Sequence, residues 1–133
     1  MQEIKLRQSW INNFLRCPEQ ARQERFGLVT QRETSDLLRG NAVHAAIEYA
    51  GLALLQRGKR VELEELLDVS DSFLASYALD VEVWRQGYEQ TVDVCRQNLE
   101  CWHNELSPIL DPTAVEESFT KEIGVRGNIR LMM

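Results

Sequence analysis

The chain has 133 residues, of which 44% are hydrophobic and 27% are charged, and its formal net charge is −6 at pH 7. This length suits a single domain (residues 1–133), and the apolar content supports a hydrophobic core, so an intrinsically disordered chain is not expected. The acidic balance argues against a protein that coats nucleic acid through charge alone, because phosphate binding depends on clustered lysine and arginine.

The basic residues are concentrated near the start of the chain. Residues 1–40 contain seven basic and five acidic side chains, whereas residues 41–133 contain eight and sixteen. Any contact with nucleic acid is therefore expected near the first 40 residues; alternatively, these arginines form an ordinary solvated helix face. The candidate DNA-binding residues are Ser9, Arg16, Arg22, Arg25 and Arg39.

Nothing in the sequence indicates secretion or membrane insertion. The longest apolar stretch, residues 42–55, is interrupted by His44 and Glu48 and is shorter than the roughly 20 residues of a membrane span. No cleavable signal sequence opens the chain. The three cysteines show no CxxC spacing, which disfavours a disulfide framework or a zinc site. We therefore expect a cytoplasmic protein with reduced thiols and no membrane partner.

The first predicted element is a helix over residues 8–27, with Ser9 as N-cap, a break or kink near Pro18, and an end at Gly27. A polar connection over residues 28–35 follows. Residues 36–60 form the strongest predicted helix, with Thr34 or Ser35 as N-cap and Gly58 as the stop signal. Its buried stripe is expected to consist of Val43, Ala46, Ile47, Ala50 and Leu54.

Two further helices are predicted over residues 63–79 and 82–106, the second ending at the Ser-Pro-Ile-Leu-Asp-Pro segment. After Pro112 the pattern becomes extended, which predicts two strands with Gly124 at the turn. The expected fold class is α+β: mainly helical over residues 1–110, with a β-hairpin over residues 111–133. Because an isolated hairpin is marginal, its open C-terminal edge is expected to support self-association.

Three stretches carry a resemblance to a known family. Residues 9–18 read SWINNFLRCP, residues 40–48 read GNAVHAAIE, and residues 116–132 read EESFTKEIGVRGNIRLM. In order and spacing they resemble the RecB-like branch of the PD-(D/E)XK nucleases, which includes the CRISPR-associated iron-sulfur nucleases. The matching family motifs are an opening helix that ends in Cys-Pro, a Gly-x-x-x-His-x-x-x-Glu helix, and a Glu-x-x-Phe strand followed by a Gly-x-x-Asp strand.

The resemblance implies the amino-terminal portion of a restriction-endonuclease-like α/β/α core that hydrolyses DNA with Mg²⁺ or Mn²⁺ in recombination, repair or phage replication. A helicase or recombination protein would be a further partner. His44 corresponds to the metal ligand that the family places on its helix, and Glu48 is a weaker candidate. The positions that match the family for structural reasons are Gly40, Cys17, Pro18 and Gly127.

The sequence departs from the family where the active site should be completed. Aligning Gly127 with the family glycine places Arg130 where the metal-binding aspartate belongs, and no Glu-x-Lys strand follows. Arginine stays protonated and cannot bind a cation. We therefore expect this 133-residue chain to be inactive and to hold no metal. Only Cys17 matches one of the family's cluster ligands, so an iron-sulfur cluster is not expected. Cys17 is instead expected to be a small buried residue.

Several interpretations remain open at this level. Gly40, His44 and Glu48 form a second helix stripe along the edge of the expected buried one, and the histidine and glutamate could instead be a surface pair worth a few tenths of a kcal/mol. The three tryptophans are expected to pack in a core or interface rather than to stack on bases. The chain could be a nuclease fragment or frameshift product, a short DNA- or protein-binding module, or an unrelated acidic helical interaction domain.

Overall fold

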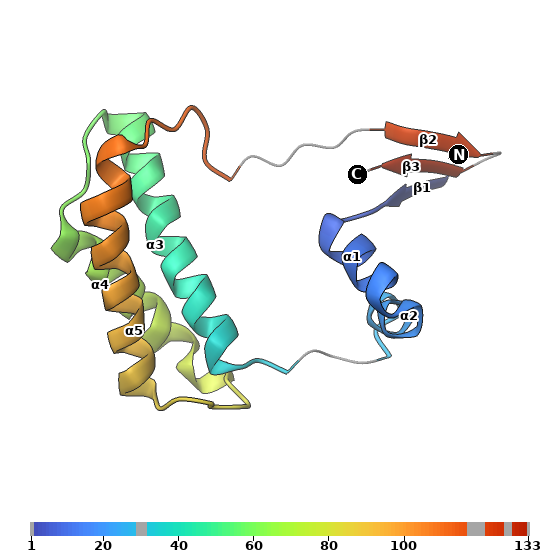
Figure 1. Cartoon of the computed structure of the whole chain (residues 1–133), viewed down its shortest axis with the longest axis horizontal. Helices are drawn as coiled ribbons and strands as arrows, with labels where there is room; N and C mark the ends of the chain where they lie inside the picture. The colour runs from blue at the N-terminus through green and yellow to red at the C-terminus, as the bar shows by residue number, and fades with distance from the viewer. Residues whose placement is uncertain (1, 29–31, 117–121, 127–128, 133) are drawn as a thin grey trace. The chain divides into compact units, whose positions relative to one another are not determined.

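The structure is a computed structural model that describes residues 2–28, 32–116, 122–126 and 129–132. The chain divides into two compact units. Residues 32–117 form the helical unit, and residues 1–31 together with 118–133 form the mixed unit, which contains two helices and a small sheet (Figure 1). The expected α+β class with mainly helical content is confirmed.

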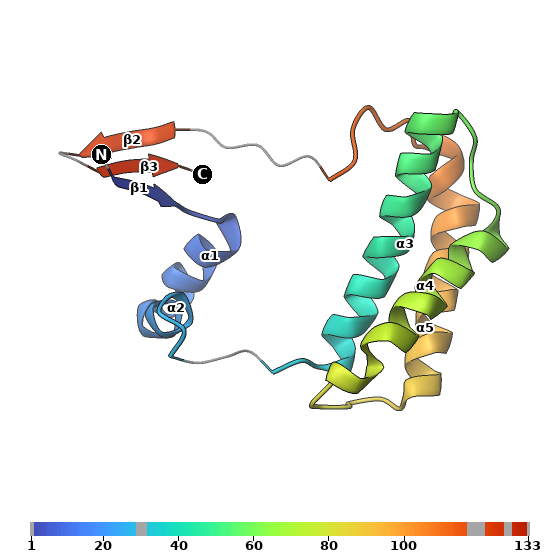
Figure 2. The same cartoon turned by 180° about the vertical axis from the view of Figure 1, so that it is seen from behind.

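The helical unit is a bundle of three helices, α3 (Ser35–Arg57), α4 (Leu63–Tyr77) and α5 (Tyr88–Cys101), each of which packs against the other two (Figures 1 and 2). A 3₁₀ turn, Ala78–Asp80, follows α4. A π-helical turn, Trp102–Leu106, and a 3₁₀ turn, Ser107–Ile109, follow α5 and end the helical part of the unit. Within the described residues, no helix is both long and apolar enough to cross a membrane.

Helix α3 begins and ends at the residues that its sequence signals indicate. Of the two N-cap candidates, Thr34 is the cap: its Oγ1 accepts a hydrogen bond from the backbone N–H of Leu37 at 3.3 Å. At the other end, Gly58 adopts φ +64 and donates its N–H to the carbonyl of Leu54 at 2.9 Å. The stop predicted at Gly58 is confirmed, and its left-handed conformation explains why glycine suits that position.

The buried stripe of α3 differs from the predicted one. The buried hydrophobic residues are Leu38, Ala42, Ala46, Ala50 and Ala53, whereas Val43, Ile47 and Leu54 are only partly buried. Alanine has a small side chain, so this face lets α4 and α5 approach closely and brings α3 against their leucines. The core is completed by Val61 before α4, by Leu66 and Leu74 of α4, and by Cys95 and Leu99 of α5.

This shift also moves the stripe that carries His44. Gly40, His44 and Glu48 each lie two residues from a buried alanine of α3, which is about 200° around the helix. They therefore occupy the face opposite the core, and the expectation that they border the buried stripe is wrong.

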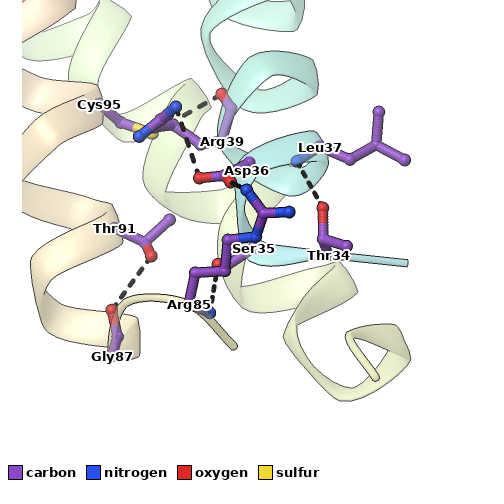
Figure 3. A network of polar contacts seen from close by, with 9 residues as sticks. All are labelled: Thr34, Ser35, Asp36, Leu37, Arg39, Arg85, Gly87, Thr91 and Cys95. Carbon is purple, nitrogen blue, oxygen red and sulfur yellow. Dashed lines mark hydrogen bonds and ion pairs between the residues drawn. The ribbon is translucent and has the colours of Figure 1, made fainter. Parts of the chain in front are cut away.

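Helix α5 starts six residues later than predicted. Residues 82–87 do not extend it, because Val83 instead forms a parallel bridge with Thr34, just before α3. The N–H of Ser35 donates to the carbonyl of Val83 at 3.0 Å. The Ser35 hydroxyl accepts from the N–H of Arg85 at 3.0 Å (Figure 3). These hydrogen bonds give backbone groups of this segment partners outside a helix. The spacing of its apolar side chains is what predicted a helix there.

Substitution by alanine should have opposite effects at Gly40, inside α3, and at Gly58, which caps its C-terminal end. Gly58→Ala should lower the free energy of unfolding by about 1 kcal/mol, because an L-residue is strained at φ +64. Gly40→Ala should raise it by about 0.5–1 kcal/mol, because a Cβ at this helical position would meet no described atom within 4 Å. Urea denaturation followed by circular dichroism would measure both, and a destabilising Gly40→Ala would indicate a close contact at that glycine.

The mixed unit contains α1 (Gln8–Arg16), α2 (Pro18–Arg25) and a sheet of β1 (Gln2–Lys5), β2 (Glu122–Arg126) and β3 (Ile129–Met132). The strand order is β1-β3-β2, with β3 parallel to β1 and antiparallel to β2. Strand β1 was not predicted. Gly124 lies within β2, beside an irregularity in the pairing, so the turn predicted there is wrong; the link between β2 and β3 falls at residues 127–128, outside the described residues.

The final strand is central in this sheet. Because β1 pairs with one side of β3 and β2 with the other, β3 offers no open edge for self-association, and the outer edges belong to β1 and β2. The expectation of an open C-terminal edge is therefore wrong.

The two helices of the mixed unit meet at the predicted break. Helix α1 ends at Arg16, Cys17 links the helices in an extended conformation, and Pro18 is the first residue of α2. Pro is well suited to a first helical position, because its missing N–H would have no helical partner there. The predicted N-cap at Ser9 is wrong: α1 begins at Gln8 after Arg7, without a side-chain cap.

Candidate metal site and nucleic-acid interface

The exposed face of α3 presents His44 to a carboxylate from a distant part of the sequence. His44 Nε2 lies 2.8 Å from Oε1 of Glu116, and the two side chains are 61% and 52% exposed. Glu116 adopts φ +50, a left-handed conformation that is uncommon for a residue other than glycine. Sequence reasoning placed Glu116 in the Glu-x-x-Phe motif but gave it no role, because no periodicity connects it to α3.

The segment that carries Glu116 contacts α3 and the loop that follows it. The Arg60 guanidinium donates to the carbonyls of Ser107 and of Leu110, the latter at 2.9 Å. Farther along, Val115 packs so closely on Gly51 that a Cβ there would lie 2.7 Å from Val115 Cγ2. A cavity of about 310 Å³ lies along this segment, with apolar walls that include Ile47, Leu54, Val61, Trp102, Leu110 and Pro112. The contacts of residues 107–115 therefore help to place Glu116 beside His44.

The donor set around His44 is small. Glu48 lies one helical turn beyond His44 and is half-buried, but the partner of the imidazole is Glu116. Among the described residues, no group of three or more His, Cys, Asp or Glu side chains converges in a way that could hold a metal ion. Mg²⁺ and Mn²⁺ prefer an octahedral shell made mostly of oxygen ligands. One imidazole and one carboxylate do not fit that requirement.

Strand β3 carries the position that the resemblance assigns to the family aspartate. Arg130 lies in the middle of this strand, opposite Glu3 of β1 and Val125 of β2. Gly127, on which that alignment depends, lies outside the described residues. The correspondence between Arg130 and the metal-binding aspartate stays a prediction.

The candidate DNA-binding residues are divided between the two units. Ser9, Arg16, Arg22 and Arg25 lie on α1 and α2 and are exposed. Arg39 belongs to α3, where its guanidinium lies 3.5 Å from Asp36; that carboxylate also lies 3.2 Å from Arg85 (Figure 3). The structure thus brings four of the five candidates into one small region and ties Arg39 to an acidic partner elsewhere.

The two units differ more in net charge than residues 1–40 and 41–133 do. The mixed unit holds eight basic and four acidic residues, a balance of +4, whereas the helical unit holds seven and seventeen, a balance of −10. A polyanion would be attracted to the first unit and repelled by the second. Any nucleic-acid interface is therefore expected on the mixed unit.

Within that region, Arg22 has a carboxylate partner. Its Nε and Nη2 donate to the two oxygens of Glu19 at 2.9 and 2.7 Å. This bidentate bond is the main reason that the pKa of Glu19 is lowered to about 2, although both side chains are more than half exposed. Glu19 therefore stays ionised at neutral pH and offsets part of the charge that Arg22 offers to a phosphate.

The cysteines do not form a cluster site. All three are free thiols; Cys17 and Cys101 are exposed, and Cys95 is buried. The expectation that Cys17 is buried is wrong, because it lies in the link between two short helices. Burial raises the pKa of the Cys95 thiol, whose Sγ lies 3.8 Å from the carbonyl of Arg39. Cys95 is thus a packing residue of the helical unit.

Comparisons with protein-family models, curated proteins and solved structures found no match to this chain. The resemblance to RecB-like nucleases accordingly rests on the three sequence motifs and stays a prediction.

Proposed function

We propose that this chain carries the helical region and first sheet strands of a RecB-like PD-(D/E)XK nuclease, a family that hydrolyses DNA with divalent metal ions. The observation that carries the proposal is the contact between His44 and Glu116. Both residues belong to stretches that resemble family motifs, the Gly-x-x-x-His-x-x-x-Glu helix and the Glu-x-x-Phe strand, and these stretches lie far apart in the sequence. An exposed imidazole and an exposed carboxylate are two of the ligand types that a divalent-metal site of this family would need.

We further propose that this chain binds DNA without cleaving it. In the family, the metal polarises the phosphate and lowers the pKa of the attacking water. Here the described donors are too few for a hard cation, and an arginine at position 130 would repel one. The concentration of positive charge in the mixed unit supports DNA as the partner.

The DNA-binding part of the proposal predicts a salt-dependent affinity that depends on α1 and α2. Fluorescence anisotropy with a labelled oligonucleotide should show binding that weakens between about 50 and 200 mM salt. Combined Arg16→Ala, Arg22→Ala and Arg25→Ala should weaken binding and reduce the slope of log K against log salt by about 2 to 3.

A variant with the same change in charge provides the control for this measurement. Combined Arg32→Ala, Arg57→Ala and Lys59→Ala removes three cations from the exposed surface of the acidic helical unit. That variant should bind DNA as the unchanged chain does. Absence of binding at low salt, or an equal loss in both triple variants, would remove the proposal of a DNA-binding surface on the mixed unit.

The second part predicts no cleavage. Supercoiled plasmid incubated with the chain and Mg²⁺ or Mn²⁺ should remain intact, and Arg130→Asp should not restore nicking, because one added carboxylate would still leave too few ligands. Gel electrophoresis would detect a single nick. Metal-dependent nicking that both His44→Ala and Glu116→Ala abolish would show instead that the chain assembles a working site.

A further inference from the structure

The helices of the mixed unit enclose a groove with aromatic and cationic walls. Its volume is about 450 Å³, and its lining includes the rings of Trp10, Phe14 and Phe26 and the guanidinium groups of Arg22 and Arg25. All five residues come from α1, α2 and the residue that follows α2. The groove is thus formed by one short stretch of chain, the stretch in which four of the candidate DNA-binding residues lie.

One of the three aromatic rings is fixed by a hydrogen bond, and the other two are exposed. Trp10 and Phe14 stack, with ring centroids 5.6 Å apart and 23° between the ring planes. The indole N–H of Trp10 donates to the carbonyl of Ala21 at 3.3 Å, which fixes this ring against α2. Phe14 is 45% exposed and Phe26 is 71% exposed. Exposed phenyl rings beside a fixed indole offer surfaces on which a planar apolar group can stack.

Cationic side chains surround these rings. A second hollow, of about 390 Å³, shares Trp10 and Arg25 with the groove and adds Lys5 and Arg7. The acidic residues lining the two hollows are Glu19, which binds Arg22, and Glu24, whose carboxylate accepts hydrogen bonds from Asn13 and Gln20. Among the residues whose side chains the structure describes, none forms an ion pair with Lys5, Arg7 or Arg25. Proteins that bind single-stranded nucleic acid combine cations, which contact the phosphates, with exposed aromatic rings, on which the bases stack.

We propose that this groove binds single-stranded DNA, with unpaired bases stacked on Phe14 and Phe26 and with Lys5, Arg7 and Arg25 beside the phosphates. Single strands fit better than a duplex, because paired bases present their edges and not their faces to a protein. The choice of DNA over RNA rests on the proposed function. Stacking tolerates any base, so the site is expected to show little sequence preference.

The test separates stacking from phosphate binding. Anisotropy would compare an oligothymidine of about 16 nucleotides with a fully abasic strand of the same length, which keeps the phosphates and lacks the bases. The unchanged chain should bind oligothymidine about 10-fold or more tightly than the abasic strand. Phe26→Ala should weaken oligothymidine binding about 5- to 30-fold and leave the abasic strand unaffected, whereas Phe26→Trp should retain the preference.

Two matched variants complete the design. Leu15→Ala removes an apolar side chain that is 77% exposed on α1 and does not line the groove, so it should change neither affinity. Arg25→Ala should weaken binding to both strands, because its contribution is electrostatic. Circular dichroism of each variant would confirm that its helices are intact.

Each failure has a separate meaning. Equal affinity for the oligothymidine and the abasic strand, with normal salt dependence, would overturn stacking and leave the proposed DNA binding in place. Loss of all binding at low salt would overturn both. Tighter binding of oligouridine than of oligothymidine would overturn the assignment to DNA. Concentration-dependent dimerisation in light scattering that Phe26→Ala abolishes would show instead that the groove is an interface between copies of the chain.

Discussion

Replacing Leu66 by alanine should lower the free energy of unfolding of the helical unit by about 2–5 kcal/mol. Leu66 of α4 is fully buried in a cluster with Val61, Leu99 and three alanines of α3. The cost of a large-to-small substitution depends on how far the neighbours can move into the space that is left. Alanine side chains have no rotamers with which to fill it, so the cavity should persist and the loss should lie toward the upper end of that range.

Urea denaturation of the full chain, followed by circular dichroism, would measure this loss. Leu79→Ala provides the control, because Leu79 lies in the 3₁₀ turn that follows α4 and is 98% exposed. Its effect should stay within about 0.5 kcal/mol. A change below about 1 kcal/mol for Leu66→Ala would mean that the bundle relaxes around the missing side chain, and the tight contact assigned to the alanine face of α3 would then be wrong.

Local signals in the sequence were sufficient for several helix boundaries in both units. The N-cap candidate Thr34, the stop at Gly58, and the break at Pro18 each depend on the chemistry of one or two residues, and the structure has each of them. The face of α3 was harder to predict. Hydropathy favours bulky aliphatic side chains, whereas the close approach of three helices favours small ones, and that preference is set by the partners.

The remaining differences concern contacts between distant segments. Strand β1 has only four residues, and it forms through pairing with β3 at the other end of the sequence. The bridge between Thr34 and Val83 also joins segments that are distant in the sequence, and because of it α5 begins later than predicted. The candidate site follows this rule as well. A motif indicated His44, but its contact with Glu116 depends on how residues 107–116 cross α3, which no periodicity encodes.

The alanine face of α3 should also resist enlargement. Ala46→Leu is expected to lower the free energy of unfolding by about 1–3 kcal/mol, because Ala46 is fully buried where α3 meets its partner helices. Ala75→Leu adds the same atoms at an exposed position of α4 and should change stability by no more than about 0.5 kcal/mol. The same denaturation measurement distinguishes the two variants, and equal effects would contradict close packing at Ala46.

Combining the two core substitutions tests whether they act on the same space. Ala46 and Leu66 belong to one buried cluster, so the leucine added at position 46 can occupy part of the volume that Leu66→Ala leaves. The double variant should therefore be more stable than the sum of the single losses predicts, with a coupling of about 0.5–3 kcal/mol. Strict additivity would place the two side chains in separate parts of the core. Since Ala46 and Leu66 both belong to the core of the helical unit, these variants should leave DNA binding by the mixed unit unchanged wherever the chain remains folded.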